Sequence, residues 1–320
     1  MPTLLSVDNL HTSFPSDQGS VDAVRGVTIP LAQGSVLALV GESGSGKSMT
    51  ALSIMRLVPP PGIISTGKII FDGKDLLTIS DDAMRGVRGR RISMVFQEPM
   101  TSLNPVLRIS DQLTEPLILH KRLSRPDAFD SGVKLLTEVG IPSAGDRMRD
   151  YPHQLSGGMR QRVMIAMALA CSPALLIADE PTTALDVTIQ AQILELLDGL
   201  RGSTGLSMLL ITHDLGIVSE RSEHTFVMYA GQIVESAPTK MLLSAPLHPY
   251  TQALIASLPQ YAVPGKQLKT LAGQMTGMKP GFKGCAFAGR CPTASGDCFY
   301  QTQELLEMVP SHSVRCWKCR

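Results

Sequence analysis

The chain of 320 residues has few aromatic side chains and almost no excess of charge. Phe, Trp and Tyr together make up 4% of the residues, and 29 lysines and arginines balance 28 aspartates and glutamates, which leaves a formal net charge of +1. Proteins that bind nucleic acids usually carry a basic excess on at least one face. Beyond a short basic stretch at residues 85–91 we find no such excess, so we expect no nucleic-acid partner.

Long apolar segments of the kind that span a membrane are also missing. The apolar run at residues 163–178 is interrupted by Pro173 and is shorter than the roughly 20 apolar residues that cross a bilayer as a helix. The N-terminal segment has an early acidic residue and lacks the basic region that opens a secretory signal peptide. The sequence therefore predicts a cytoplasmic protein whose membrane role, if it has one, depends on separate partners.

Cysteine is scarce until the C-terminal end of the chain. Cys171 stands alone in an apolar stretch, where a small core residue is the usual interpretation. The other cysteines are Cys285, Cys291, Cys298, Cys316 and Cys319. In a reducing compartment such a cluster indicates a metal site before it indicates disulfides.

Strand and helix patterns alternate along the chain, and 43% hydrophobic residues suffice for a sizeable core. We expect strands at residues 4–14, 21–31, 36–40, 68–71, 92–96, 175–178 and 207–212, and helices at 47–57, 112–120, 128–139 and 189–200. This alternation predicts a largely parallel sheet with helices on its faces. Helical periodicity dominates residues 100–165, which we interpret as an inserted subdomain. Residues 259–280, rich in Pro and Gly, predict a loosely ordered connector.

Residues 41–48 carry the most specific pattern, Gly-Glu-Ser-Gly-Ser-Gly-Lys-Ser, which fits the P-loop at every position. Glycines let backbone N–H groups turn inward around phosphate oxygens, and the following helix points its positive end at the same anion. Lys47 is expected to reach the β- and γ-phosphates and Ser48 to hold Mg²⁺. The predicted nucleotide-binding residues are Gly41, Ser43, Gly44, Ser45, Gly46, Lys47, Ser48 and Met49. The alternative is a Gly/Ser-rich turn that matches by chance.

Two carboxylates, Asp179 and Glu180, end the apolar strand predicted at 175–178. Asp179 suits a Mg²⁺ partner beside a P-loop, and Glu180 suits a general base for the attacking water. A solvated strand end is the alternative interpretation.

A second candidate phosphate-binding loop is Ser156-Gly157-Gly158. A hydroxyl and free amides at a helix N-terminus bind anions well, although the same pattern is typical of an ordinary helix N-cap. Since the P-loop already serves the nucleotide of this chain, a second loop indicates a nucleotide held by another subunit.

The order and spacing of these motifs resemble the ATP-binding-cassette (ABC) ATPases over residues 4–240. The resemblance implies that Phe14 stacks on adenine, that Gln97 senses Mg²⁺ and water, that Gln154 to Gly158 form the signature loop, and that Asp186 and His213 match the aspartate loop and the switch histidine. Each match has a simpler alternative, such as a surface glutamine or an ordinary hydrogen-bonded histidine. The implied fold is α/β: a P-loop NTPase core with a mixed, largely parallel sheet, an inserted helical subdomain at about 100–165, and a cysteine-rich C-terminal extension.

The resemblance further implies an ATPase that hydrolyses ATP when two such subunits close head to tail. We expect an ATPase domain at residues 1–240 and an extension at 241–320. Catalysis would involve Lys47, Gln97, Glu180 and His213, with Mg²⁺ held through Ser48 and Gln97. P-loop kinases, and soluble cassettes that act on DNA or ribosomes, are the alternatives from other classes.

Residues 247–254 (LHPYTQAL), 100–105 (MTSLNP) and 179–190 (DEPTTALDVTIQ) resemble the oligopeptide and dipeptide importer branch of that family. Nickel, microcin and glutathione importers share these features, and a generic dimer-stabilising tail is the other alternative. The implied partners are a second, related ATPase subunit, two integral membrane permease subunits and an extracytoplasmic solute-binding protein. The implied location is peripheral, at the cytoplasmic face of the inner (plasma) membrane.

The cysteine-rich tail resembles that of peptide-importer ATPases that carry an iron–sulfur cluster, with matches at Cys285, Cys291, Cys298 and Cys316. Four thiolates are the ligand count of a [4Fe–4S] cluster, but they also suit tetrahedral Zn²⁺. Cys319 is then an extra thiol or an alternative fourth ligand. We expect an iron–sulfur cluster, with zinc as the alternative.

Overall fold

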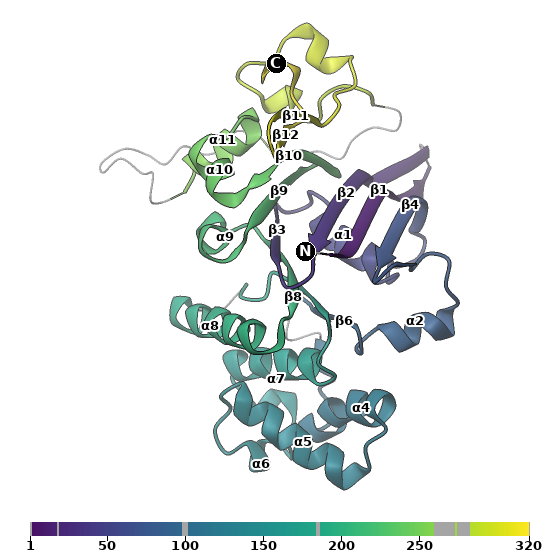
Figure 1. The fold of residues 1–320 in the computed structure, drawn as a ribbon, viewed down its shortest axis with the longest axis vertical. Helices are drawn as coiled ribbons and strands as arrows, with labels where there is room; N and C mark the ends of the chain where they lie inside the picture. The colour runs from purple at the N-terminus through teal and green to yellow at the C-terminus, as the bar shows by residue number, and fades with distance from the viewer. Residues whose placement is uncertain are drawn as a thin grey trace. The chain divides into compact units, whose positions relative to one another are not determined.

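The computed structural model describes residues 2–17, 19–97, 102–183, 186–258, 273 and 282–319. The connector predicted at 259–280 lies almost entirely outside these residues. The chain divides into two compact units, and Figure 1 labels the helices and strands of both. We call residues 78–209 the helical unit, and residues 2–77 together with 210–320 the P-loop unit. No helix in the described part of the chain is long and apolar enough to cross a membrane.

The P-loop unit begins with a four-stranded antiparallel sheet in the order β2-β1-β4-β5. Its strands are β1 (Thr3–Ser16), β2 (Gly19–Ala32), β4 (Ile63–Phe71) and β5 (Lys74–Asp75). The turn between β4 and β5 contains Asp72 and Gly73, both with positive φ (50° and 75°), which is the geometry that an Asp-Gly turn favours.

A second set of strands in this unit surrounds β3 (Val36–Val40). All five residues of β3 are buried, as expected for a strand covered on both faces. Strand β3 pairs in parallel with β9, whereas β9, β10, β12 and β11 follow one another in antiparallel pairs. The later strands are β9 (His224–Tyr229), β10 (Gln232–Pro238), β11 (Leu306–Val309) and β12 (His312–Val314). Short turns join β9 to β10 and β11 to β12, so these pairs are antiparallel and the sheet is more mixed than the sequence predicted.

The helices of the P-loop unit are short. They are α1 (Lys47–Ile54), α9 (Leu215–Arg221), α10 (Thr239–Ser244) and α11 (Pro249–Ala256), with 3₁₀ turns η3 (Ala288–Arg290), η4 (Gly296–Phe299) and η5 (Trp317–Cys319). Helix α1 starts where predicted but ends at Ile54 rather than Leu57. One buried cluster joins strand residues such as Val40 and Tyr229 with Tyr250 and Phe287 of the C-terminal segment. The extension therefore contributes to the core of the unit that carries the P-loop.

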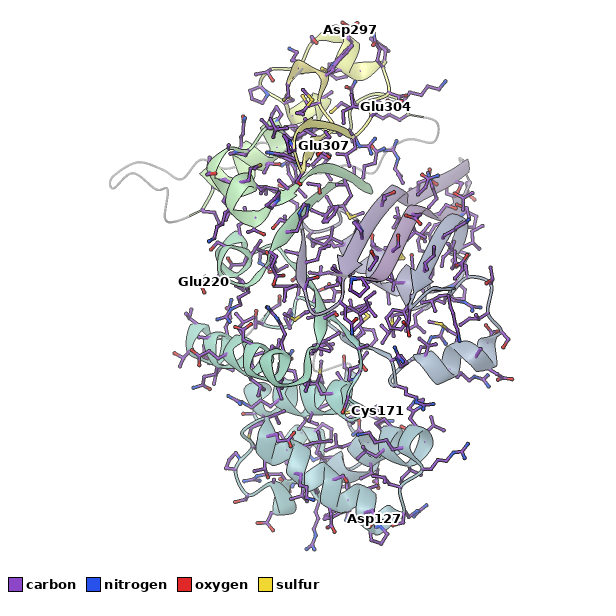
Figure 2. The ribbon with its side chains drawn as sticks, in the orientation of Figure 1. Asp127, Cys171, Glu220, Asp297, Glu304 and Glu307 are labelled. Carbon is purple, nitrogen blue, oxygen red and sulfur yellow. The ribbon has the colours of Figure 1, made fainter. Side chains whose placement is uncertain are left out.

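The helical unit holds the predicted inserted helices. Its elements are α2 (Asp81–Val87), β6 (Ile92–Val95), α4 (Ile109–Lys121), α5 (Arg125–Glu138), α6 (Ala144–Arg147), η1 (Pro152–Gln154), α7 (Gly157–Leu169), β7 (Leu175–Asp179) and α8 (Val187–Thr204). Strand β8 (Ser207–Thr212) runs from this unit into the other. Strands β6 and β7 pair in parallel. Cys171, labelled in Figure 2, is buried and donates to the Pro116 carbonyl at 3.4 Å, as expected of a core cysteine.

Candidate functional site

The P-loop between β3 and α1 has the backbone that its glycines predict. Gly44 and Gly46 have φ values of 81° and 106°, in the region that favours glycine. A Cβ at Gly46 would lie 2.5 Å from the Ala23 carbonyl oxygen, so a larger residue would displace the loop. Gly46 is also the N-cap of α1, so the helix N-terminus points into the loop that precedes it.

The polar side chains of the P-loop are well placed for an anion. Lys47 is 5% exposed, and its Nζ donates to the carbonyl oxygens of Gly41 and Glu42 at 2.8 and 3.0 Å. The buried Ser45 hydroxyl has no hydrogen-bond partner among the described residues. Ser48 and Met49 open α1 and are half-buried, while Ser43 is exposed. An unpaired hydroxyl in a glycine-rich loop beside a buried lysine fits a phosphate group.

Phe14 lies near the end of β1 and is half-buried. Its ring packs over Gly62, where an added Cβ would come within 2.5 Å of Phe14 Cε1. The glycine leaves room for the ring to lie against the backbone. The predicted stacking of Phe14 on adenine stays a prediction.

In the helical unit, Asp179 and Glu180 follow the buried strand β7 and are 3% and 9% exposed. The solvated strand end considered as an alternative is therefore wrong. Glu180 Oε2 accepts hydrogen bonds from Gln97 Nε2 at 3.1 Å and from Thr183 Oγ1 at 2.8 Å. Glu180 has a φ of 46°, which is unusual for a residue with a side chain and is typical of functional sites. The unit thus brings Gln97 and Glu180 together and adds Thr183, which sequence reasoning missed. Glu98 and Pro99 lie outside the described residues.

The candidate signature loop opens α7. Ser156 is the N-cap, and its hydroxyl accepts from the Met159 amide at 3.3 Å, so the N-cap interpretation is confirmed. Ser156 and Gly157 are exposed, and a Cβ at Gly157 would meet no atom within 4 Å. A capped, exposed helix N-terminus remains able to bind a phosphate from outside the chain.

Asp186 and His213 lie at the ends of elements. The Asp186 carboxylate caps α8 by accepting from the Ile189 amide at 2.9 Å, and the preceding Ala184 and Leu185 lie outside the described residues. His213 is exposed just after β8, and the next residue, Asp214, caps α9.

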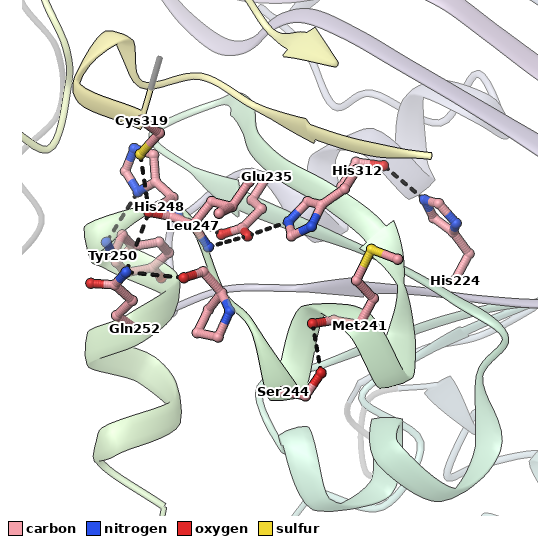
Figure 3. A network of polar contacts seen from close by, with 12 residues as sticks. His224, Glu235, Met241, Ser244, Leu247, His248, Tyr250, Gln252, His312 and Cys319 are labelled. Atoms are coloured by element: carbon pink, nitrogen blue, oxygen red, sulfur yellow. Dashed lines mark hydrogen bonds and ion pairs between the residues drawn. The ribbon is translucent and has the colours of Figure 1, made fainter. Parts of the chain in front are cut away.

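A buried polar network anchors the C-terminal segment (Figure 3). Glu235 on β10 is fully buried, and its carboxylate accepts from the amides of Leu247 and His248 at 2.7 and 2.9 Å and contacts His312 Nε2 at 2.7 Å. His248 Nδ1 in turn accepts from the Tyr250 amide at 3.0 Å. Burial, together with the nearby Arg315, lowers the pKa of His248 to about 4. The His-Pro-Tyr motif is therefore held by a carboxylate that the sequence analysis did not single out.

The cysteines of the tail come together around one small cavity. Cys285, Cys291, Cys298 and Cys316 all line this space of about 20 Å³. Burial and the neighbouring thiols of Cys316, Cys298 and Cys291 raise the pKa of Cys285 to about 11. Cys319 instead donates to the Leu247 carbonyl at 3.2 Å. Within the described ranges, however, no group of three or more His, Cys, Asp or Glu side chains is arranged to hold a metal ion, so the predicted [4Fe–4S] or zinc site has no support there.

Comparison with known proteins agrees with the motifs. Residues 24–183 match the ABC transporter family, and residues 234–298 match the family described as the oligopeptide/dipeptide transporter, C-terminal region. The chain belongs to the ABC transporter ATPase family. It is 49% identical to the dipeptide transport ATP-binding protein DppD of Bacillus subtilis, covering 99% of this chain and 95% of that protein. It is also 50% identical to the oligopeptide transport ATP-binding protein AppD of the same species, covering 99% and 97%.

Among solved structures, a dimeric ATP-binding cassette bound to ADP and phosphate in a post-hydrolysis state is similar to this chain. The match has a TM-score of 0.67 and 26% identity, and it covers 73% of this chain and 98% of that one. The P-loop kinases considered above are excluded by the family membership.

Proposed function

We propose that this chain is the ATP-hydrolysing subunit of a membrane importer for dipeptides or oligopeptides. The observation that carries the proposal is the presence, in one chain, of a P-loop and of the C-terminal region that oligopeptide and dipeptide transporters share. Relatives named for dipeptide and oligopeptide transport match nearly the whole chain and support the same function. No observation favours nickel, glutathione or another solute over a peptide.

The proposed ATP site assigns one role to each residue. The P-loop amides and Lys47 hold the phosphates, Phe14 stacks on adenine, Glu180 polarises the attacking water, and His213 contacts the γ-phosphate. Ser48 and Gln97, with Asp179 as a further partner, would hold Mg²⁺, which would supply positive charge against the phosphates. Support comes from the buried, unpaired Ser45 hydroxyl in the P-loop and from the hydrogen bonds that fix Glu180.

The proposed assembly contains two ATPase subunits that close head to tail. The exposed signature loop, Ser156 to Gly158, would contact ATP held by the opposing subunit, and Asp186 would border the same interface. We propose that the second ATPase is a related chain, that two integral membrane permeases transmit the closure, and that an extracytoplasmic solute-binding protein delivers the peptide. The chain would then sit peripherally on the cytoplasmic face of the membrane, with no nucleic-acid partner.

The experiment that tests this function is purification of the tagged chain from membranes of its own organism. Integral membrane subunits and a second ATPase should copurify with it, because the ATPase subunit acts only through them. Copurification of ribosomes or DNA without membrane subunits would reject the proposal.

We also propose that an ATPase domain ends at about residue 240 and that the extension begins there. In the extension we propose a metal cluster. The proposed ligands are Cys285, Cys291, Cys298 and Cys316; they line one cavity, although their side chains are not arranged around a metal ion in the described residues. A bound [4Fe–4S] cluster would supply folding free energy to this segment. Protein purified without oxygen should be brown and contain iron and acid-labile sulfide, and chelation should lower its stability. A colourless anaerobic preparation with stoichiometric zinc would show that the bound metal is zinc and not iron. A preparation with neither metal would reject the site.

A further inference from the structure

Glu42, the second residue of the P-loop, is held by the C-terminal extension. Its carboxylate forms a two-point ion pair with Arg290, at 2.6 Å from Nη1 to Oε2 and 3.0 Å from Nη2 to Oε1. The Arg290 side chain is 9% exposed and that of Glu42 is 28% exposed. This bidentate geometry, largely shielded from water, is the strongest form of an arginine–carboxylate pair.

The backbone of Glu42 is held as well. Its amide donates to the Tyr250 hydroxyl at 2.8 Å, and its carbonyl accepts from Lys47 Nζ at 3.0 Å and from the Ser45 amide at 3.2 Å. Tyr250 is fully buried and belongs to the His-Pro-Tyr motif. Glu42 thus connects the extension on one side with the P-loop lysine on the other.

Arg290 lies between two of the tail cysteines. It ends the 3₁₀ turn η3, which follows Cys285 and precedes Cys291, and backbone hydrogen bonds link both cysteines to Ala288. Its guanidinium carbon lies 5.8 Å from the ring centre of Tyr229 and 6.0 Å from that of Phe287.

The sign of the charge on Glu42 makes this contact matter for nucleotide binding. The loop binds phosphates, and an anionic side chain within it repels them unless a cation neutralises it. Removing Arg290 would leave a half-buried carboxylate unpaired, a change that typically costs more than loss of a surface pair. The carboxylate would then either move, and pull on the Lys47 contact, or stay and repel the triphosphate.

We propose that the C-terminal extension sets the ATP affinity of the P-loop by holding Glu42 through Arg290 and Tyr250. This inference rests on the proposed ATP function. Glu42, Arg290 and Tyr250 are positioning residues, since they act through the loop and through Lys47. Any change in the cysteine-rich segment that moves η3 would reach the ATP site by this route.

The test is the Kd of the full-length chain for ATP with Mg²⁺, measured by isothermal titration calorimetry. Arg290→Met should raise the Kd at least tenfold. Arg290→Lys keeps the charge but not the two-point geometry, so its Kd should lie between those of Arg290→Met and wild type. The matched control is Arg85→Met, since Arg85 pairs with Asp82 at 2.9 Å in an exposed position. The control should change the Kd less than twofold.

A double variant separates repulsion from unfolding. Glu42→Gln in the Arg290→Met background removes the unpaired anion, so the double variant should bind ATP several-fold more tightly than Arg290→Met alone. Tyr250→Phe, which removes only the hydroxyl, should weaken binding even if Arg290→Met does not fold.

An Arg290→Met variant with the wild-type Kd, or a double variant no better than the single one, overturns the inference. If wild type itself does not bind ATP, or binds it equally after Lys47→Ala, the proposed ATP function fails instead.

Discussion

At the scale of single residues, the candidate site depends on how Glu180 is held. The sequence predicts carboxylates at the end of a buried strand, and the structure confirms this. The resemblance singles out Gln97, and in the structure this side chain donates a hydrogen bond to Glu180. Thr183 could not be predicted, because its contact requires the chain to turn back after Glu180, whose φ of 46° no local sequence rule anticipates. Glu42 was missed for a similar reason: its partner Arg290 is remote in the sequence.

We predict that Thr183→Val lowers the ATP turnover rate about ten- to hundredfold and leaves the Kd for ATP unchanged. The variant loses a hydrogen bond to a charged group, worth about 1.5–3 kcal/mol, and the carboxylate can then leave the position of a general base. Glu180→Gln should give the lowest turnover rate, several orders of magnitude below wild type, while ATP binding is retained. Steady-state hydrolysis by the purified assembly measures both.

The control for this variant is Thr188→Val, an exposed position in the first turn of α8. It should retain the wild-type turnover rate. Equal rates for Thr183→Val and wild type would show that Thr183 does not position Glu180.

At the scale of elements, strands and helices with strong apolar patterns were predicted close to their observed bounds. Strand β3 and the helices α4, α5 and α8 are examples. The strands β5, β9, β10, β11 and β12 were missed, since they are short or carry polar residues whose partners are distant. Glu235 on β10 is the clearest case, because a glutamate in a sequence is expected at the surface, whereas here two backbone amides and His312 satisfy it in the core.

The buried His248 predicts that the protein loses stability in acid. Its folded-state pKa of about 4 lies below the ordinary value of about 6.5. Between these pH values the imidazole is protonated in the unfolded state and neutral in the folded state. The free energy of unfolding therefore falls between about pH 6.5 and pH 4, by up to about 3 kcal/mol from this group. His248→Asn keeps an acceptor for the Tyr250 amide but does not titrate, so it should lose less stability over this interval.

Urea denaturation at pH 7 and pH 4.5 measures the difference between the two proteins. His153→Asn is the control, because His153 is exposed and its loss should leave the pH dependence as in wild type. A His248→Asn variant with the wild-type pH dependence would show that His248 is not the group responsible.

At the scale of the whole molecule, the sequence separates an ATPase domain from a tail, whereas packing joins part of the tail to the P-loop unit. Tyr250 and Phe287 are buried in one cluster with Val40 of the strand that leads into the P-loop. Other aromatic residues of the tail, such as Phe299 and Tyr300, are exposed and lie outside this cluster. The contact could not be predicted, because composition does not tell which surface a segment will cover.

The most direct test of the account is the ATPase rate of the assembly purified on the tagged chain and placed in lipid. The rate is measured with and without the proposed solute-binding protein loaded with a peptide. We predict that the peptide-loaded protein raises the rate, and that Glu180→Gln abolishes hydrolysis in both conditions while ATP remains bound. A rate that responds to another solute but to no peptide would contradict peptide import, and an active assembly without membrane subunits would contradict the transporter itself.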